Sequence, residues 1–599
     1  MKTVRIGGAS SFYTDSMTSV AQLLAADPCP QYLMFDFMSE GTIGAMARSM
    51  ATDPDGGYAQ DLITIHIGAN LHDLVAKKVK IIANAGGMNP RGCAAAIEAM
   101  LKERGVTLKV AHVEGDNLLA REAEVRAVAP KEMFSGEAFP EKVDSINVYL
   151  GAFPIAQALA AGADIVVTGR CADSALGLGP LIHEFGWQAD EWDKLAAGTL
   201  VGHLLECGCQ VTGGTFTDWE DVSGWENVGF PIAEVAADGS CVITKPQGTG
   251  GLVSVGTVAE QLLYEVSDPQ AYIVADVVCD FSGVKLEQVG ENRVSVSNAR
   301  GYPATDSYKG VISYEAGWRG SYSQVIIGMD AVRKGERQGE ALVERGRRLL
   351  RGRNLGDYIR TDVDLVGAET AYGPHGRAGG VREVFMRASV DHQEKAGAEL
   401  FCREALASTS AMAPGSSATI SVVITPLSKL FLFLFPKSQV EVTVMIGGQT
   451  LAAPQYPGRR FDPASLVRPP APASPQAADD MTEVPLVTLA WGRSGDKGNL
   501  FNVAAIARRP EFVPYIRAAL TSAKVAERFA FLCEGKEPEV STFEVPGFHA
   551  VNFVVHNAMD GGILMSPRVD NAAKGMAQQI LETPVAVPAS LLRRASALL

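Results

Sequence analysis

The chain lacks the segments that mark membrane or exported proteins. Its longest run of bulky apolar residues, Leu430 to Phe435, is far too short to span a bilayer. The N-terminal residues have no apolar core of the kind found in signal peptides. The nine cysteines are scattered and odd in number, which favours reduced thiols over a disulfide framework. We therefore expect a cytoplasmic protein with no membrane partner.

Positive charge is also scarce. The sequence has 53 Lys and Arg against 68 Asp and Glu, a formal net charge of −15 at pH 7. An acidic surface repels phosphate backbones, so we expect no nucleic-acid partner. A local cluster of cations remains compatible with this balance. The expected partner is therefore a small anionic substrate.

Several motifs that carry cofactor chemistry are missing. No G-x-G-x-x-G follows the first apolar run, and no Gly-Lys-Ser/Thr follows the glycines at 248–251. Cys207-Gly-Cys209 has no second cysteine pair, and no H-E-x-x-H occurs. We assign no metal site and no firmly implied cofactor. A nucleotide-dependent ligase is a third hypothesis, resting only on the glycine loops near Gly248 and Arg493.

Glycine is abundant, with 61 residues, and many glycines follow short apolar runs. A run, a glycine-rich loop and a helical stretch recur along the first third of the chain, which is typical of a parallel α/β sheet. The runs are at 4–6, 32–37, 80–83, 108–113 and 164–168. The predicted fold class is therefore α/β, with a large parallel-sheet core followed by a small α+β domain.

A proline-rich stretch gives the clearest domain boundary. Four prolines fall within residues 469–475 and favour an extended linker. We predict an α/β core over 1–455, which is either one unit or two subdomains, a linker over 456–482, and an α+β domain over 483–599. A homo-oligomer is expected for an enzyme of this type.

The ends of the predicted strands carry polar residues. In a parallel α/β sheet the carboxyl ends of the strands meet at one crevice, where ligands bind. The alternative is that these residues are only turn formers and helix caps. The acid/base candidates are Asp36, Glu114, Asp116 and Asp173. The substrate-binding candidates are Gly7, Gly8, Ser10, Asn84, Asn89, Arg170, Lys245, Arg493 and Lys497.

Residues 493–499, Arg-Ser-Gly-Asp-Lys-Gly-Asn, form the densest group of charges in the C-terminal domain. We predict a loop between two apolar strands. Such a loop would hold a phosphate or carboxylate with Arg493 and Lys497. Equally, Asp496 would neutralise both cations and leave a structural turn.

Taken together, these motifs resemble the acyclic terpene utilisation (AtuA-like) family. The resemblance covers roughly residues 3–450, and the last 115 residues resemble the ferredoxin-like domain often fused to it. In that domain the family signature usually reads Gly-Asp-Lys-Gly-Asp, whereas this chain has Asn499 at the last position. The motifs lie at 7–10, 36–40, 57–58, 84–90, 114–116, 169–173, 211–214, 245–251 and 493–498.

The resemblance implies a role in breaking down acyclic terpenes or branched-chain acids. Because carboxylates are present and redox motifs are not, we expect hydratase, lyase or hydrolase chemistry on an acyl-CoA or its free acid. A CoA thioester would then be a substrate rather than a cofactor. The alternative is a non-catalytic scaffold subunit that holds other enzymes of the pathway.

Overall fold

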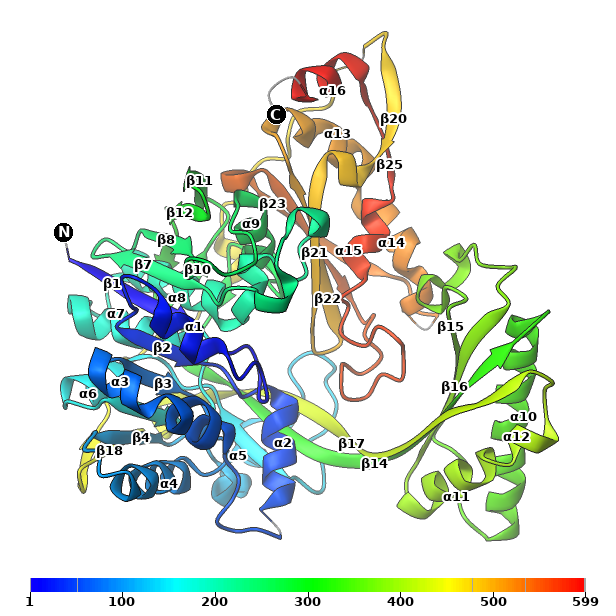
Figure 1. Cartoon of the computed structure of the whole chain (residues 1–599), viewed down its shortest axis with the longest axis horizontal. Coiled ribbons are helices and arrows are strands. Elements are labelled where there is room, and N and C mark those ends of the chain that lie inside the picture. Colours follow the sequence, from blue (N-terminus) through cyan, green and yellow to red (C-terminus); the bar gives the residue numbers. More distant parts are fainter. Residues whose placement is uncertain (1, 51, 477, 534, 597–599) are drawn as a thin grey trace.

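The computed structural model describes residues 2–50, 52–476, 478–533 and 535–596. Residues 1, 51, 477, 534 and 597–599, which fall within the predicted core, linker and C-terminal domain, lie outside the described residues. The chain forms an α/β body, an arm that projects from it and a C-terminal domain above both (Figure 1). Some of the functional candidates lie where these three parts meet.

The body is built on one large mixed sheet. Five neighbouring strands, β1, β2, β3, β6 and β4, run parallel, and the strands outside them pair antiparallel. The predicted parallel sheet is therefore correct only for the centre. The strand order is β11 (Lys285–Gly290), β12 (Arg293–Ser297), β8 (Cys241–Thr244), β7 (Ile232–Ala236), β1 (Thr3–Gly8), β2 (Tyr32–Phe35), β3 (Lys80–Ala83), β6 (Ile165–Thr168), β4 (Val110–Glu114), β18 (Thr443–Ile446) and β19 (Gln449–Ala452).

Helices cover both faces of this sheet. All four side chains of β2 and of β6 are buried, as expected for strands covered on both faces. One face packs against α1 (Ser19–Ala25), α3 (Leu71–Lys77) and α4 (Pro90–Glu103). The other packs against α6 (Phe153–Ala160), α7 (Ala175–Phe185), α8 (Trp192–Glu206) and α9 (Val255–Leu263). A further helix, α2 (Glu40–Ser49), follows β2 and contacts β5 (Ser145–Val148) and the two long strands described next.

The arm is a four-stranded antiparallel sheet with its own core. Its two long strands, β14 (Ser307–Ile327) and β17 (Ser416–Pro436), pair along 21 residues each and run from the body to the tip (Figure 1). Near the body β14 also pairs with β5 (Ser145–Val148). The remaining elements are β15 (Arg360–Val366), β16 (Glu383–His392), α10 (Ala331–Gly352), α11 (Lys395–Ala405) and α12 (Ser408–Ala411).

The C-terminal domain is an antiparallel sheet with helices on one face. Its strand order is β21-β22-β24-β23, and a short β20–β25 pair lies beside it. Its helices enclose a separate apolar core. The elements are β20 (Met481–Pro485), β21 (Ala490–Lys497), β22 (Leu500–Ala507), α13 (Val513–Ala519), α14 (Ser522–Phe529), β23 (Glu539–Val545), β24 (Ala550–His556), α15 (Met576–Leu581), β25 (Pro584–Pro588) and α16 (Ala589–Ser596).

The predicted loop at 493–499 is wrong, because β21 continues through Lys497 and only Gly498 and Asn499 form the turn. The glycines in this strand allow close packing, not a loop. A Cβ on Gly495 would lie 2.7 Å from both the Tyr264 ring and the Glu265 side chain. Glycine inside a strand often marks such a close approach.

Buried asparagines join the C-terminal domain to the body. Asn502 donates to the carbonyl of Leu263 at 2.8 Å, and Asn552 donates to the carbonyls of Val266 and Ser267 at 2.8 and 2.7 Å. These carbonyls lie at and just beyond the end of α9, where helix carbonyls lack partners within the helix. The contact therefore fixes α9 against the outer face of the C-terminal sheet.

Glu260 of α9, which accepts from the Thr217 N–H at 3.1 Å, gives the stability of the fold a pH dependence. It is 3% exposed, and burial raises the pKa of its carboxyl from 4.5 to about 7. The folded state then binds more protons than the unfolded state between these values, so stability falls as pH rises through this window. Glu260→Gln should be neutral near pH 4 and should gain up to about 3 kcal/mol of unfolding free energy at pH 8.

Urea unfolding at pH 5 and pH 8 would measure this difference. Glu226→Gln, an exposed carboxylate, is the matched control and should show no change at either pH. A Glu260→Gln effect of equal size at both pH values would contradict the expectation.

Candidate functional site

Two strand ends on the body present a carboxyl and an amide to each other. Asp36 follows β2 and Asn84 follows β3. The Asn84 amide donates to Asp36 Oδ1 at 2.7 Å, and its oxygen accepts from the backbone N–H of Phe37 at 2.7 Å. Asn84 is fully buried, so it is locked in this orientation. The Ser10 hydroxyl, beyond β1, donates to the Asp36 carbonyl at 3.1 Å.

Arg170, beyond β6, is the buried cation of the same edge. It is 2% exposed, and its Nη1 lies 2.5 Å from Asp173 Oδ1. Its guanidinium stacks on the ring of Tyr149 at 4.2 Å, and its Nη2 lies 3.9 Å from Glu40 Oε1. Arg170 Nε has no hydrogen-bond partner among the described residues. The site therefore contains a buried donor that nothing in this part of the chain satisfies.

The arm and the C-terminal domain each add a lysine. Lys309 of β14 lies 3.6 Å from Glu40 Oε1 and 4.7 Å from the centre of the Tyr149 ring. Lys497, the last residue of β21, lies 2.5 Å from Glu265 Oε2. The Lys309 and Lys497 side chains remain 39% and 45% exposed, so solvent reaches them. The charged cluster is thus completed by all three parts of the chain.

Burial and neighbouring charges shift the pKa values of two carboxyls of the cluster in opposite directions. Burial, reinforced by the nearby Asp173, holds the pKa of Asp36 well above its ordinary value. Burial alone would also raise the pKa of Glu40. The positive charges of Lys309, Arg170 and Lys497 have the larger, opposite effect and hold that pKa well below its ordinary value. The cluster therefore pairs a carboxyl that favours its proton with one that stays ionised.

Lys497 stays charged in this arrangement. Burial would lower the pKa of its ammonium, but Glu265 and Glu40 outweigh it and raise the pKa well above the ordinary value. Glu265 has a left-handed backbone (φ 59°), which is unusual for a non-glycine residue. Such backbone strain is often found at functional sites.

The other acid/base candidates lie outside this group of contacts. The carboxylate of Asp116 is 1% exposed and accepts from the Arg170 backbone N–H and the Asn147 amide at 2.7 and 2.9 Å. Burial raises the pKa of Asp116 to about 6. Glu114 instead forms two hydrogen bonds with Arg91, on the exposed surface of α4. Asp116 therefore positions the Arg170 loop, while Glu114 makes a surface ion pair.

The remaining substrate-binding candidates have local partners. Asn89 caps α4 by accepting from the Gly92 N–H at 2.9 Å. The Lys245 ammonium donates to Thr249 of its own loop at 2.7 Å. Arg493 binds Thr215 and Gln210 of the body and stacks on Tyr264. These side chains hold the fold in place.

Gly7 and Gly8 pack within the body. A Cβ on Gly8 would lie 2.5 Å from the carbonyl oxygen of Leu205, and one on Gly7 would lie 3.0 Å from the side chains of Leu23 and Leu33. Both glycines therefore let a helix approach the first strand closely. That close packing accounts for the absence of side chains at both positions.

Several cluster residues escaped the sequence analysis as site candidates. Tyr149 and Lys309 adjoin because β5 pairs with β14, a contact between segments 160 residues apart. Glu206 and Glu265 end up near the cluster at the ends of α8 and α9. Only Glu40 carried a usable signal, since it is the last residue of the 36–40 motif. The others depend on long-range pairing that no local pattern encodes.

A long irregular loop, 557–575, closes the site from the C-terminal domain. Asn499 holds it by accepting from the Gly561 N–H at 3.0 Å and, through its carbonyl, from the Ala558 N–H at 3.1 Å. Leu564 of the loop lies against Gly41, next to Glu40. In Figure 1 the loop lies between the C-terminal domain and the end of the arm nearest the body. Asn499 thus anchors the loop with an amide where the resembled signature has an acid.

A cavity of about 420 Å³ lies beside the site. It is lined by Tyr372 from the arm and by Asp570 and Lys574 from the loop region. Lys574 Nζ also lies 3.7 Å from Glu265 Oε1, which links this cavity to the cluster. The cavity therefore offers space beside the cations for part of a ligand.

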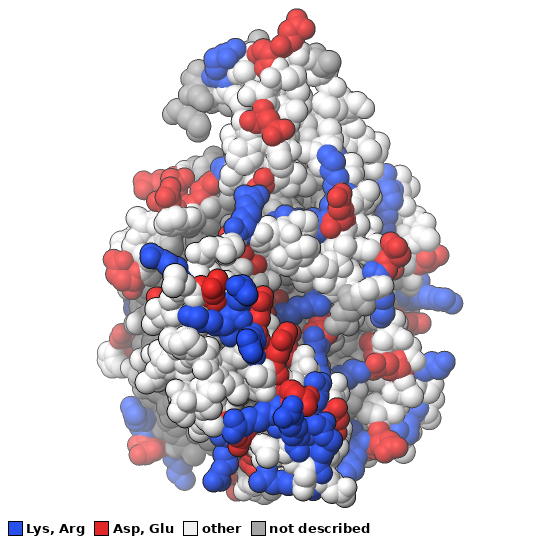
Figure 2. All heavy atoms as spheres, turned by 90° about the vertical axis from the view of Figure 1, so that its right-hand side faces the viewer, with Lys and Arg blue, Asp and Glu red and all other residues white. Residues whose placement is uncertain are grey.

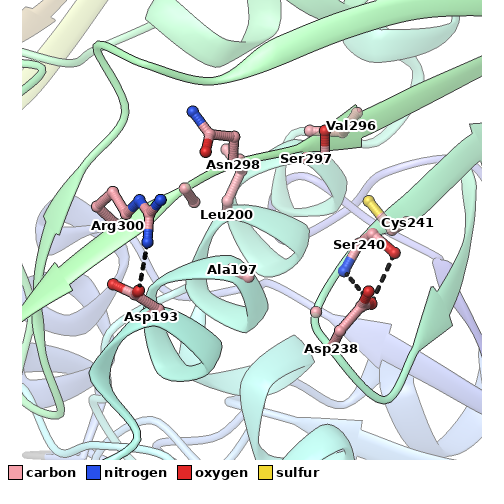
Figure 3. A pocket seen from close by; sticks show the side chains of 12 residues that line it. Asp193, Ala197, Leu200, Asp238, Ser240, Cys241, Val296, Ser297, Asn298 and Arg300 are labelled. Atoms are coloured by element: carbon pink, nitrogen blue, oxygen red, sulfur yellow. Dashed lines mark hydrogen bonds and ion pairs between the residues drawn. The ribbon is translucent and has the colours of Figure 1, made fainter.

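The other cavity, of about 250 Å³, lies at the far side of α8 (Figure 3). Its polar side chains bind one another: Arg300 pairs with Asp193 at 2.8 Å, and Ser240 donates to Asp238 at 2.7 Å. It contains none of the residues predicted from the sequence. Nothing in its lining favours a ligand.

The described residues contain no group of three or more His, Cys, Asp or Glu side chains placed to hold a metal ion. In the same part of the chain, no helix is both long and apolar enough to cross a membrane.

Comparison with known proteins identifies the family. The model of the acyclic terpene utilisation family protein AtuA matches residues 4–446, and that of the AtuA ferredoxin-like domain matches residues 484–586. Neither the curated proteins nor the solved structures give a match. The chain therefore belongs to the AtuA acyclic terpene utilisation family and carries the ferredoxin-like domain at its C-terminus, as its motifs predicted.

Proposed function

Proceeding from that family membership, we propose that the chain is a catabolic enzyme of acyclic terpene or branched-chain acid breakdown. It acts on an acyl-CoA or on the corresponding acid by non-redox chemistry of the hydratase, lyase or hydrolase type. The observation that carries this proposal is the Asp36 carboxyl, which favours its proton, beside an Asp173 carboxylate that is paired with Arg170.

In the proposed mechanism the two carboxyls divide the proton transfers. Asp36, oriented by Asn84, donates a proton to the substrate, and Asp173 accepts one, since groups in different environments take opposite roles. The unsatisfied Nε of Arg170 would donate to a substrate oxygen. The positive charge of Arg170 also stabilises negative charge that develops there in the transition state.

The lysines supply the anion site of the proposal. Lys309 and Lys497 are both partly exposed and close to the cluster, so they bind a carboxylate or the oxygen of a thioester. The larger cavity beside Lys574 would take a distal part of the substrate. In this proposal a short acyl group would lie at Asp36 and the remainder toward the loop at 557–575.

Turnover of a panel of short branched acyl-CoAs and free acids tests the proposal. Mass spectrometry would distinguish added water, a broken carbon–carbon bond and a hydrolysed thioester. We expect one compound to be turned over and to raise the melting temperature of the protein. If no compound does either, and a stoichiometric partner co-purifies from the native host, the scaffold role replaces the enzyme.

Lys497→Met tests the anion site separately. Loss of one charged hydrogen bond should weaken binding of the identified anionic ligand by about 10- to 100-fold. Isothermal titration calorimetry would measure the dissociation constant. Lys429→Met is the matched control, because it removes a partly exposed lysine that pairs with Glu137 outside the cluster. Equal affinity of the wild-type and Lys497→Met proteins would exclude Lys497 from the anion site.

A further inference from the structure

The tip half of β17 forms an open sheet edge. β17 is the last strand in the order β15-β16-β14-β17, and within the described chain no strand pairs with its outer side. Its tip half, 416–425, is mostly exposed. In its other half the carbonyl of Leu432 accepts from the N–H of Met133, so that part of the edge is covered. The unpaired backbone groups are therefore concentrated at 416–425.

This edge lacks the charges and prolines that usually protect exposed strands, although its pairing with β14 shifts register between Ile420 and Ser416. The sequence Ser-Ser-Ala-Thr-Ile-Ser-Val-Val-Ile-Thr has no charge, no proline and no glycine. Natural edges are normally blunted by lysine, proline, bulges or a covering segment. Ile420, Val422 and Val423 are instead 38%, 41% and 49% exposed. Such a strand is suited to pairing with another strand.

We propose that the partner is a second copy of this chain, with β17 pairing antiparallel to β17 of that copy across a two-fold axis. The two arm sheets then form one eight-stranded sheet. A second strand satisfies the whole row of main-chain groups of an open edge, and an uncharged β-branched strand is complementary to itself. With the axis at Ser421, each Ile420 faces a Val422 of the other copy, an apolar cross-strand pair. Residues 417–425 of each copy then pair, and these nine residues add about nine hydrogen bonds.

Charge distribution favours this arrangement over contact through the body. The arm, residues 307–436, has 17 Lys and Arg against 14 Asp and Glu, although the whole chain is at −15. Figure 2 looks onto the arm side and shows many Lys and Arg side chains low in the view, where the arm lies. Pairing through the tips keeps the two acidic bodies apart. Long-range repulsion is then lowest at the surface that is open to pairing.

Sedimentation velocity of the full chain at micromolar concentration tests the proposal. We expect a dimer for the wild type and a monomer for Val422→Lys, in which each new lysine lies at the pairing edge. Val422 is partly exposed, so the variant should keep the wild-type melting temperature. Ile359→Lys is the matched control: Ile359 is 58% exposed beside β15, at the opposite edge of the same sheet, and this variant should stay dimeric.

A cysteine at the axis tests the register. Cα atoms of directly opposed antiparallel residues lie about 4.5–5.5 Å apart, within the range of a disulfide. Ser421→Cys should therefore form a covalent dimer on mild oxidation, and Ile359→Cys should not. A monomeric wild type, or a dimer that survives Val422→Lys, would overturn the proposal whatever the protein's catalytic activity.

Discussion

Asp36→Asn is expected to lower kcat on the identified substrate by about 10²- to 10⁴-fold, the usual contribution of a general acid. Asparagine keeps the size of the side chain, and its oxygen still accepts from the Asn84 amide. The fold should therefore hold while the transferable proton is lost. Because burial and the nearby Asp173 keep the pKa of Asp36 high, wild-type activity should decline as pH rises through the pKa of Asp36.

Steady-state rates from pH 5 to 10 measure both effects. The alkaline limb should be present in the wild type and absent from the residual activity of Asp36→Asn. Glu114→Gln is the matched control, because its carboxylate also ends a strand but pairs with Arg91 at the surface, and it should retain its rate. If Asp36→Asn kept the full rate with an unchanged pH profile, Asp36 would not be the acid.

Arg170→Met is expected to cost about 3–5 kcal/mol of unfolding free energy, as is usual when one partner of a buried ion pair is removed. Arg170 is 2% exposed, contacts Asp173 and lies near Glu40. Methionine fills part of the volume against Tyr149 but leaves these carboxylates without the guanidinium.

Urea unfolding of Arg170→Met alone and combined with Asp173→Asn separates charge from packing. If uncompensated charge dominates, the double variant should recover at least 1 kcal/mol relative to Arg170→Met, a coupling typical of contacting residues. Asp164→Asn, whose carboxylate pairs with Lys80 elsewhere in the body, should recover nothing in the same background. Additive costs for Arg170→Met and Asp173→Asn would show that the lost packing against Tyr149 is the main effect.

The parallel centre of the body could be predicted because its signals are local. Short apolar runs that end in glycine and polar residues mark β1, β2, β3, β4 and β6, and the polar ends of β2, β3 and β6 do meet. The arm could not be predicted in this way. Its 21-residue strands mix buried and exposed stretches without a regular pattern, and their pairing joins residues about 90 to 129 positions apart.

The candidate site also divides into residues that the sequence could indicate and residues that it could not. Asp36, Asn84, Arg170 and Asp173 were accessible to sequence reasoning because each directly follows a strand of one sheet. Lys309 was not, because it reaches Glu40 only through the pairing of β14 with β5. Lys497 was selected for its charge, yet its position depends on how β21 packs against α9. Sequence patterns locate groups along one element, whereas the meeting of three parts depends on tertiary packing.

The arm holds the loop at 557–575 in a way that does not depend on the side chains of that loop. Arg319 donates to the carbonyls of Met565 and Ser566, and Arg387 donates to that of Pro567. Both arginines bind main-chain carbonyl oxygens, which are present at every position whatever the side chain. Side chains at loop positions such as Leu564 can therefore change without loss of these hydrogen bonds. The position of the loop is then set by arginines of the arm and not by the identity of its own side chains.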